Sequence, residues 1–287
     1  MNATRGVSAG PPGRPPRRRL VLCAFHSLLA LSVFGDALPG TNPAPGPADP
    51  VAVQPVAAPA PPADADSPLD EPLRLVAEAR RSYRQVRDYT CLMVKREKLQ
   101  GQLSPDHLVR LAVRTQPFSV DMLWQGPAEL NGQEACYVAG KNKGRMRARS
   151  AGVLGKLGFV TLDPDDPRTR ESSNHSITEA GIGHLIERYA KLWEQERALN
   201  RTAVKLSTYD YNKRRCTRVE ATHADNRDGR FPAYRTVLYF DQETHLPIRL
   251  ELYDWPRDGG ERGELIELYA YVNLRLNVGL GDEAFDH

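Results

Sequence analysis

The sequence predicts an α+β fold in which one large, curved antiparallel sheet has its concave face covered by two amphipathic helices. Segments in which apolar and polar residues alternate, the pattern of half-buried strands, fill most of the chain from residue 88 onward. Only two segments with helical spacing of apolar residues interrupt them. This order does not suit a parallel sheet, in which a helical crossover joins successive strands.

The charge distribution argues against a general nucleic-acid binder. The 287 residues carry a formal net charge of +3, but residues 1–37 hold five arginines and one acid, or +4, so the remainder is 3 − 4 = −1. A nucleic-acid-binding domain would instead be basic. With 40% hydrophobic and 26% charged residues, the composition is that of an ordinary globular protein.

Residues 1–37 have the organisation of an export signal, either a signal peptide or a signal anchor. A basic stretch ends at Arg19, an apolar run follows from Leu20 to Phe34, and Gly35-Asp36-Ala37 suits cleavage after Ala37. The apolar run of about 15 residues is shorter than the roughly 20 that a membrane-spanning helix needs. The long basic stretch leaves an uncleaved anchor as the alternative. We expect membrane contact only through this signal or anchor.

Residues 38–68 predict a disordered tether. They contain ten prolines and many alanines, with almost no large apolar side chains. Such a segment cannot bury enough surface to fold, and its proline content favours a semi-extended chain. The folded part is therefore expected to be one domain that spans residues 69–287.

Two segments of this domain have the apolar stripe of an amphipathic helix. The first spans about residues 69–87, and Ser67 or Asp70 can cap its start. The second begins near Ile177, where residues 176–179 fit a capping box. The apolar face of the second helix consists of Ile182, Leu185, Ile186, Tyr189, Leu192 and Trp193.

The remaining segments are predicted to be strands, and Phe118–Gln125 shows the clearest alternation. In the last strand, every second residue from Ile266 to Leu274 is apolar, and these residues are predicted to share one face. The predicted strands are Tyr89–Leu99, Leu108–Thr115, Phe118–Gln125, Glu134–Lys141, Arg145–Ser150, Phe159–Leu162, Ala203–Tyr211, Cys216–His223, Tyr234–Asp241, Leu246–Trp255 and Glu264–Leu276.

Short motifs mark this domain from end to end. They include Asp88-Tyr89-Thr90-Cys91, Lys95-Arg96-Glu97, Pro117-Phe118-Ser119-Val120, Ile177-Thr178-Glu179-Ala180-Gly181-Ile182-Gly183, Cys216-Thr217-Arg218-Val219-Glu220, Leu246-Pro247-Ile248-Arg249, Tyr253-Asp254-Trp255-Pro256 and Asn277-Val278-Gly279-Leu280. With these motifs the chain resembles an uncharacterised bacterial family of exported proteins, a domain of unknown function. The resemblance implies a protein that is periplasmic or tethered to the outer face of the inner membrane.

The order of helix, strands, helix and strands is similar to that of the LolA/LolB and RseB group. Those periplasmic proteins hold the acyl chains of lipoproteins in a half-open β-barrel closed by helices. The resemblance implies that residues 69–287 form a LolA-like half-barrel, which binds a lipid or lipoprotein acyl chain between sheet and helices. The residues expected to line the cavity are Phe118, Val120, Met122, Trp124, Tyr189 and Trp193.

The same six residues also fit a second interpretation, in which they fill an ordinary core. The protein would then be a structural or protein-interaction module of the cell envelope that has no ligand and acts through its rim. A continuous apolar pocket of some hundreds of Å³ would distinguish the carrier from this module.

The domain contains three cysteines, Cys91, Cys136 and Cys216. In an oxidising compartment, an odd number suggests one disulfide and one free thiol. Cys91 and Cys216 lie in motifs of the resembled family, whereas Cys136 stands where that family usually has an aliphatic residue. The resemblance therefore implies a Cys91–Cys216 disulfide, and the alternative is three separate buried thiols.

No segment carries a complete catalytic or metal-binding signature, and we expect neither an enzyme nor a cofactor. His184 and Glu187 can place two metal ligands on one helical face, but no third ligand is obvious and no HExxH motif is present. A hydrolase triad can be drawn from one loop, but the nucleophile elbow is absent. The residues of that triad would come from Asp163, Ser172, Ser173 and His175.

Basic residues occupy every second position from Lys141 to Arg149. On a strand they would form one cationic ladder, although the turn at Lys143-Gly144 would divide it. Such a ladder can contact anionic head groups or an acidic partner. A solvated strand face is the usual explanation of such a run, and we favour it here.

Overall fold

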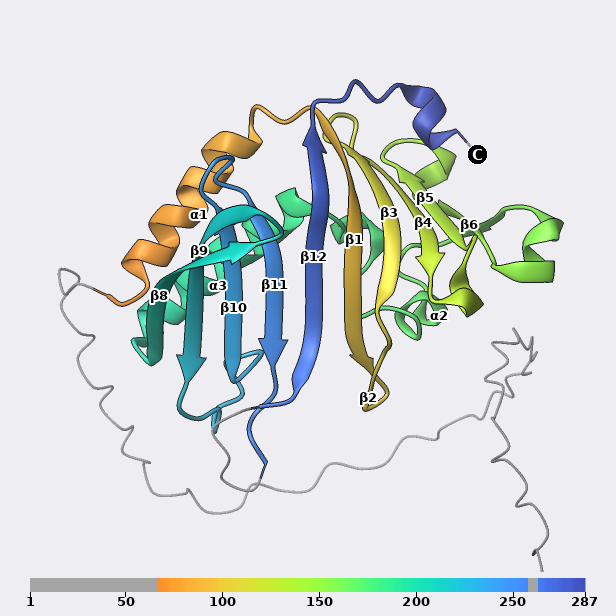
Figure 1. The fold of residues 1–287 in the computed structure, drawn as a ribbon. Helices are drawn as coiled ribbons and strands as arrows, with labels where there is room; N and C mark the ends of the chain where they lie inside the picture. The colour runs from red at the N-terminus through yellow and green to blue at the C-terminus, as the bar shows by residue number, and fades with distance from the viewer. Residues whose placement is uncertain (1–66, 258–262, 287) are drawn as a thin grey trace, which may run out of the picture. The chain divides into compact units, whose positions relative to one another are not determined.

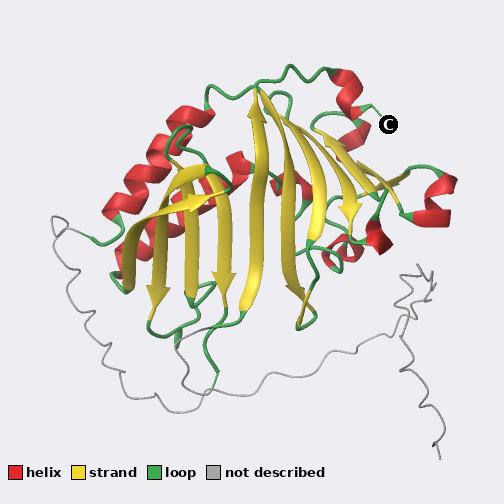
Figure 2. Ribbon diagram, viewed as in Figure 1, coloured by secondary structure: helices red, strands yellow, loops and turns green. Residues whose placement is uncertain are grey.

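The computed structural model describes residues 67–257 and 263–286, which form one antiparallel sheet with two long helices on one face (Figures 1 and 2). The predicted fold class is therefore confirmed. The sheet does not close, since β7 and β8 lie at its two ends. The expected export signal and the expected tether up to residue 66 lie outside the described residues. No helix in the described ranges is long and apolar enough to cross a membrane.

The sheet has 12 strands, in the order β7-β6-β5-β4-β3-β1-β12-β11-β10-β9-β8, and β2 pairs with β1 beside this path. Each predicted strand is present, and its ends differ from the prediction by a few residues. The bounds are β1 (Asp88–Leu99), β2 (Gln102–Leu103), β3 (His107–Arg114), β4 (Ser119–Gly126), β5 (Glu134–Val138), β6 (Met146–Arg149), β7 (Val160–Leu162), β8 (Thr202–Tyr211), β9 (Arg214–His223), β10 (Arg235–Asp241), β11 (Pro247–Tyr253) and β12 (Leu265–Leu276).

The first helix, α1 (Asp70–Tyr83), begins where the sequence predicts. Ser67 Oγ accepts a hydrogen bond from the Leu69 N–H at 3.3 Å, and the Asp70 carboxylate accepts one from the Ser67 N–H at 2.8 Å. The N-cap residue is nevertheless Leu69, and no side chain caps the helix, so the predicted cap by Ser67 or Asp70 is wrong. The helix ends at Tyr83, before the predicted end at residue 87, and the chain then turns directly into β1.

The second long helix, α3 (Ile182–Leu199), begins five residues later than predicted. Ser176 caps only a single 3-10 turn, Ile177–Glu179, in which its Oγ accepts from the Thr178 N–H. The predicted capping box is therefore wrong as a start of α3. A short helix α2 (Pro167–Arg170) and further 3-10 turns complete the connections.

A contact between distant parts of the chain fixes the start of α3. Gly181 has a φ of +96°, which is unfavourable for other residues, and a Cβ at this position would lie 2.4 Å from Tyr89 Oη. That hydroxyl oxygen accepts a hydrogen bond from the Ile182 N–H at 2.8 Å. A tyrosine of β1 thus caps α3, which no local sequence pattern can reveal.

The core lies between the helices and the sheet, but the last strand enters it differently from the prediction. Leu268 and Val272 face away from the helices, since they pair with Arg96 and Leu92 on the outward side of β1. Tyr271 is buried on the helix-facing side instead. The register shifts near Asn273, which has a φ of +56°, and beyond this bulge Leu274 turns toward the core.

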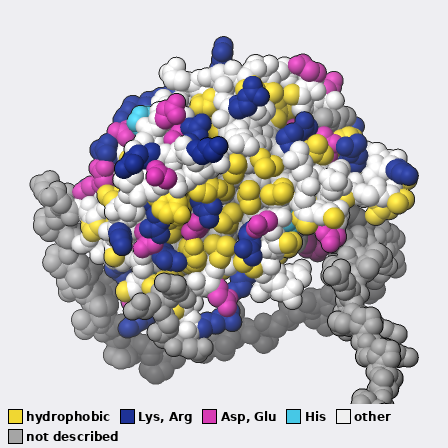
Figure 3. Space-filling view, viewed as in Figure 1, with side chains coloured by type: hydrophobic (Ala, Val, Ile, Leu, Met, Phe, Trp, Pro, Cys, Tyr) yellow, Lys and Arg dark blue, Asp and Glu magenta, His cyan; other side chains and the backbone are white. Residues whose placement is uncertain are grey.

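The outward face of the sheet consequently carries an apolar stripe in its middle (Figure 3). Its members lie opposite one another on adjacent strands: Leu92 pairs with Val272, and Val94 pairs with Leu108. These side chains are half-buried or exposed. Period-two alternation therefore predicted neither which face of β12 meets the helices nor the bulge that separates Leu274 from Leu268 and Val272.

The predicted Cys91–Cys216 disulfide is wrong: Cys91, Cys136 and Cys216 are all free and buried. Three strands separate β1 from β9, so the two cysteines lie four strand spacings apart, or roughly 19 Å. A disulfide requires Cα atoms within about 7 Å. Burial raises the pKa of the Cys91 and Cys136 thiols to about 12 and that of Cys216 to about 11. The alternative of three separate thiols describes the molecule.

We predict that Tyr89→Phe lowers the free energy of unfolding by about 1–3 kcal/mol, because it leaves the buried Ile182 N–H without an acceptor. Urea denaturation followed by circular dichroism measures this change. Tyr209→Phe is the matched control, since Tyr209 is half-exposed. Equal stability of the Tyr89→Phe variant and the parent would contradict the proposed capping role.

Candidate functional site

A groove with a volume of about 280 Å³ lies between α1 and α3. Val76 and Ala190, both buried, contribute apolar surface at its bottom, and charged side chains stand at its rim. The groove is lined by Leu73, Val76, Ala77 and Arg80 of α1 and by Ala190, Glu194 and Arg197 of α3.

Two ion pairs join the helices at this groove. Arg80 Nη2 lies 2.5 Å from Glu187 Oε2, and Arg197 Nε lies 2.6 Å from Asp70 Oδ1. The hydrogen bond from Arg80 lowers the pKa of Glu187, and the Ser67 N–H lowers that of Asp70. All four side chains are at least 40% exposed, so water screens both ion pairs. The ion pairs across the groove are therefore weak.

The six residues predicted to line a cavity are brought together on the helix-facing side of the sheet. Val120 and Trp193 are 0% exposed, and Tyr189 is 1% exposed. Tyr189 and Trp193 pack edge to face at 5.4 Å, and Phe118 packs in the same way against His184 at 5.0 Å. All six belong to one hydrophobic cluster. That they contact a ligand stays a prediction.

The indole Nε1 atoms of Trp124 and Trp193, both in this cluster, are buried and have no hydrogen-bond partner among the described residues. An unpaired buried donor costs about 1–3 kcal/mol. The core is therefore filled with apolar side chains but not fully satisfied in its hydrogen bonds.

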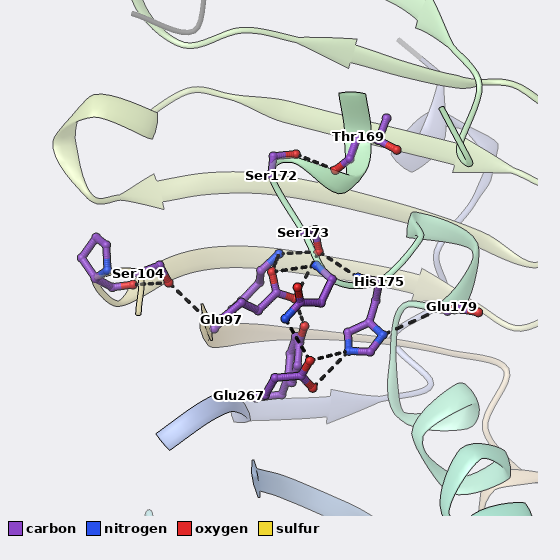
Figure 4. Close-up of polar contacts among 12 residues, drawn as sticks. Glu97, Ser104, Thr169, Ser172, Ser173, His175, Glu179 and Glu267 are labelled. Atoms are coloured by element: carbon purple, nitrogen blue, oxygen red, sulfur yellow. Dashed lines mark hydrogen bonds and ion pairs between the residues drawn. The ribbon is translucent and has the colours of Figure 1, made fainter. Parts of the chain in front are cut away.

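A second group of residues, which we call the polar cluster, lies between β1, β12 and the segment 173–175 (Figure 4). Glu97 is fully buried, and Lys95 Nζ lies 3.0 Å from its carboxylate. Ser173 Oγ donates to Glu97 at 3.1 Å and accepts from Lys95 Nζ at 2.9 Å. The Tyr269 hydroxyl donates a further hydrogen bond to Glu97.

The other half of the polar cluster surrounds Glu267. His175 Nε2 lies 3.1 Å from Glu267 Oε2, Asn174 Nδ2 donates to Glu267 Oε1 at 3.0 Å, and Arg188 of α3 lies nearby at 4.0 Å. Burial alone would raise the pKa of Glu267, but its hydrogen bonds and the charges of His175 and Arg188 outweigh burial and lower it. Burial and Glu97 raise the pKa of Tyr269 well above its ordinary value.

This arrangement does not form the hydrolase triad considered from the sequence. Ser172 Oγ donates to the Thr169 carbonyl at 2.9 Å, and Ser173 contacts Lys95 and Glu97 rather than the His175 ring. Lys95 Nζ is ion-paired with Glu97 and donates to Ser173 Oγ. The polar cluster attaches the segment before α3 to the centre of the sheet.

The metal site considered at His184 is not assembled in the described part of the chain. His184 packs against Phe118, and Glu187 is paired with Arg80. Within residues 67–257 and 263–286, no group of three or more His, Cys, Asp or Glu side chains could hold a metal ion.

Neither the groove nor the polar cluster was predicted from the sequence. A signal for the cluster was present, because Lys95, Glu97 and Glu267 interrupt the helix-facing sides of β1 and β12. Charged residues at inward strand positions are rarely tolerated without partners. The groove has no comparable signal, since it depends on how closely two helices approach.

Residues 86–287 match the model of a family described as "Protein of unknown function (DUF1571)". The chain belongs to the DUF1571 family. This confirms the family resemblance seen in the motifs. None of the curated proteins is similar enough to this DUF1571 chain to count as a match.

Several solved structures share the layout of this DUF1571 chain. MucB is 17% identical, covers 75% of this chain and 61% of its own, and has a TM-score of 0.42. The lipoprotein LppX of Mycobacterium tuberculosis is 12% identical over 76% of this chain and 100% of its own, with a TM-score of 0.43. A LolA superfamily protein from Nitrosomonas europaea is 12% identical over 78% and 99%, with a TM-score of 0.33. Likenesses of this size say nothing about a ligand.

We predict that Glu267→Gln removes part of the pH dependence of stability. Because the pKa of Glu267 is lowered in the fold from 4.5, its contribution is fully present above pH 4.5 and is lost as the pH falls through the folded value. The parent should therefore exceed the variant in unfolding free energy at neutral pH, and this difference should shrink in acid. Urea titrations between pH 7 and about pH 3.5 measure it.

Glu129→Gln is the matched control for this measurement, because Glu129 is exposed on a 3-10 turn. Its unfolding free energy should follow that of the parent at each pH. A difference between parent and Glu267→Gln that stays constant across the acid range would contradict the assigned role of the carboxylate.

Proposed function

We propose that this protein is a non-catalytic, exported binding protein of the bacterial cell envelope. Its ligand is the acyl chain of a lipid or lipoprotein, held between the helices and the sheet. The observation that carries this proposal is the groove between α1 and α3. Val76 and Ala190 at its bottom belong to the same hydrophobic cluster as Tyr189 and Trp193. An apolar pocket with few polar groups is the usual form of a small-molecule site.

The size and the rim of the groove both support the interpretation that it must widen before it can hold an acyl chain. Its volume of about 280 Å³ lies just below the roughly 300–1,000 Å³ typical of ligand pockets. The two ion pairs that bridge it are exposed and weak. A modest separation of α1 from α3 would therefore break no strong ion pair, and it would extend the groove toward Tyr189 and Trp193.

The unpaired indole N–H groups support the same proposal. Trp124 and Trp193 each hold a buried donor without an acceptor in the described residues. An ester or amide carbonyl at the head of an acyl chain would provide one. A ligand that fills apolar space and accepts a hydrogen bond matches this interior better than a pure hydrocarbon does.

A second candidate function is an envelope protein-interaction module that has no ligand. The observation that favours it is the packing of the six aromatic and aliphatic residues, three of which are at most 1% exposed. A domain with such a core is stable without a guest. Its partner would then bind at the rim or on the outward face of the sheet.

We predict that Ala77→Phe weakens binding of a fluorescent fatty acid several-fold, because the new ring fills the groove that Ala77 lines. Displacement of the probe by unlabelled fatty acid gives the affinity, and circular dichroism checks the fold. Ala198→Phe is the control, since Ala198 is exposed on the same helical layer and outside the groove.

Equal affinity of Ala77→Phe and Ala198→Phe would place the binding elsewhere. If the folded parent takes up no probe and carries no lipid or lipoprotein when purified from an envelope fraction, the carrier function is excluded. The interaction module then takes its place.

A further inference from the structure

One short segment concentrates the exposed apolar side chains of the protein. Within the described residues, eight large hydrophobic side chains are exposed, and four of them lie between residues 153 and 160. We call these four residues the apolar tip. They are Val153 (78% exposed), Leu154 (60%), Leu157 (84%) and Val160 (54%).

The apolar tip projects from the sheet. Three of its four residues lie on the 3-10 segment Gly152–Leu157, which joins β6 to β7, and Val160 is the first residue of β7. β7 is the edge strand, and in Figure 1 this connection extends beyond the sheet next to β6. The tip is therefore a convex projection, which can insert into a partner but cannot enclose one.

The sequence around the apolar tip is basic, and two of its cations are ion-paired, Arg149 with Glu134 and Lys141 with Asp282. Residues 141–160 contain six Lys or Arg residues and no Asp or Glu. Lys143, Arg145 and Lys156 are exposed and have no ion-pair partner among the described residues. Arg147 and Arg149 lie over the Phe159 ring at 5.2 and 5.1 Å, which orders the base of the projection.

We propose that the apolar tip inserts into the interface of a lipid bilayer that contains anionic phospholipids, while the surrounding cations contact the head groups. Apolar side chains flanked by Lys and Arg are the usual composition of segments that lie in a membrane interface. Each basic residue near an anionic surface adds attraction. On this proposal, the basic residues from Lys141 to Arg149 contact lipid head groups, whereas the sequence alone favoured a solvated strand face.

A bilayer fits this projection better than a protein partner does. A stable protein interface buries roughly 1,000 Å² or more of total surface, and one short turn with a single strand residue offers little of that. Insertion into lipid has no such requirement, because each apolar side chain is transferred independently. The proposal goes beyond the acyl-binding function, since it uses a surface distinct from the groove and adds a membrane contact to that expected of the export signal.

The test uses the full chain with one tryptophan introduced into the apolar tip, Leu157→Trp, and brominated phosphatidylcholine vesicles with or without phosphatidylglycerol. We expect a several-fold greater quenching of tryptophan fluorescence by vesicles with phosphatidylglycerol, and a loss of this quenching at high salt. Tyr209→Trp is the control, because Tyr209 is about half exposed on an edge strand of the same sheet. The three native tryptophans, Trp124, Trp193 and Trp255, give the same background in both proteins.

The result that overturns the proposal is quenching of Leu157→Trp that does not exceed that of Tyr209→Trp. This outcome includes the case in which another part of the chain alone anchors the protein to vesicles. Quenching that is as strong without phosphatidylglycerol overturns the role of the cations. Fatty-acid binding is measured without vesicles, so its failure and the failure of membrane insertion are distinguishable.

Two double variants give an independent readout by vesicle flotation. Leu154→Asp with Leu157→Asp should reduce the salt-sensitive fraction of protein that floats with the vesicles several-fold, and Leu206→Asp with Tyr209→Asp should not. Both pairs replace exposed side chains, so neither is expected to unfold the domain. Equal losses in the two pairs would show that general negative charge, rather than the apolar tip, governs the contact, and would overturn the proposal.

Discussion

The pairing of β1 with β12 is the contact on which the rest of the structure depends. It joins the strands before α3 to those after it, so that one sheet forms from two distant parts of the chain. The register places Glu97 directly opposite Glu267. Two carboxylates in that position would repel each other. The polar cluster offsets this repulsion. Lys95, Tyr269 and Ser173 contact the Glu97 carboxylate. His175, Asn174 and Arg188 lie around the Glu267 carboxylate.

The sequence was sufficient to predict the strands and the existence of both helices, because alternation and helical spacing are local properties. It was not sufficient to predict what depends on partners. The start of α3 is set by Tyr89, which lies 93 residues before Ile182. The orientation of β12 is set by a bulge at Asn273 that reverses which side chains face the helices.

The candidate site shows the same division. Phe118, Tyr189 and Trp193 belong to one hydrophobic cluster, because strand alternation and helical spacing both mark the apolar faces that become buried. The disulfide prediction was wrong because strand order decides the distance between Cys91 and Cys216, and the motifs carry no information about strand order. The groove escaped prediction for a related reason: Ala77 and Ala190 are ordinary helix residues until two helices place them side by side.

The two helices are held by different kinds of contact, and this difference bears on how a ligand would enter. The N-terminus of α3 is fixed by the buried hydrogen bond to Tyr89, and Arg188 lies beside the polar cluster. The ion pairs that join α1 to α3 are exposed, and water competes for them. If the helical layer opens, we therefore expect α1 to move and α3 to stay. The aromatic rings of Tyr189 and Trp193 on α3 would then keep their positions against the sheet while the space above them becomes accessible.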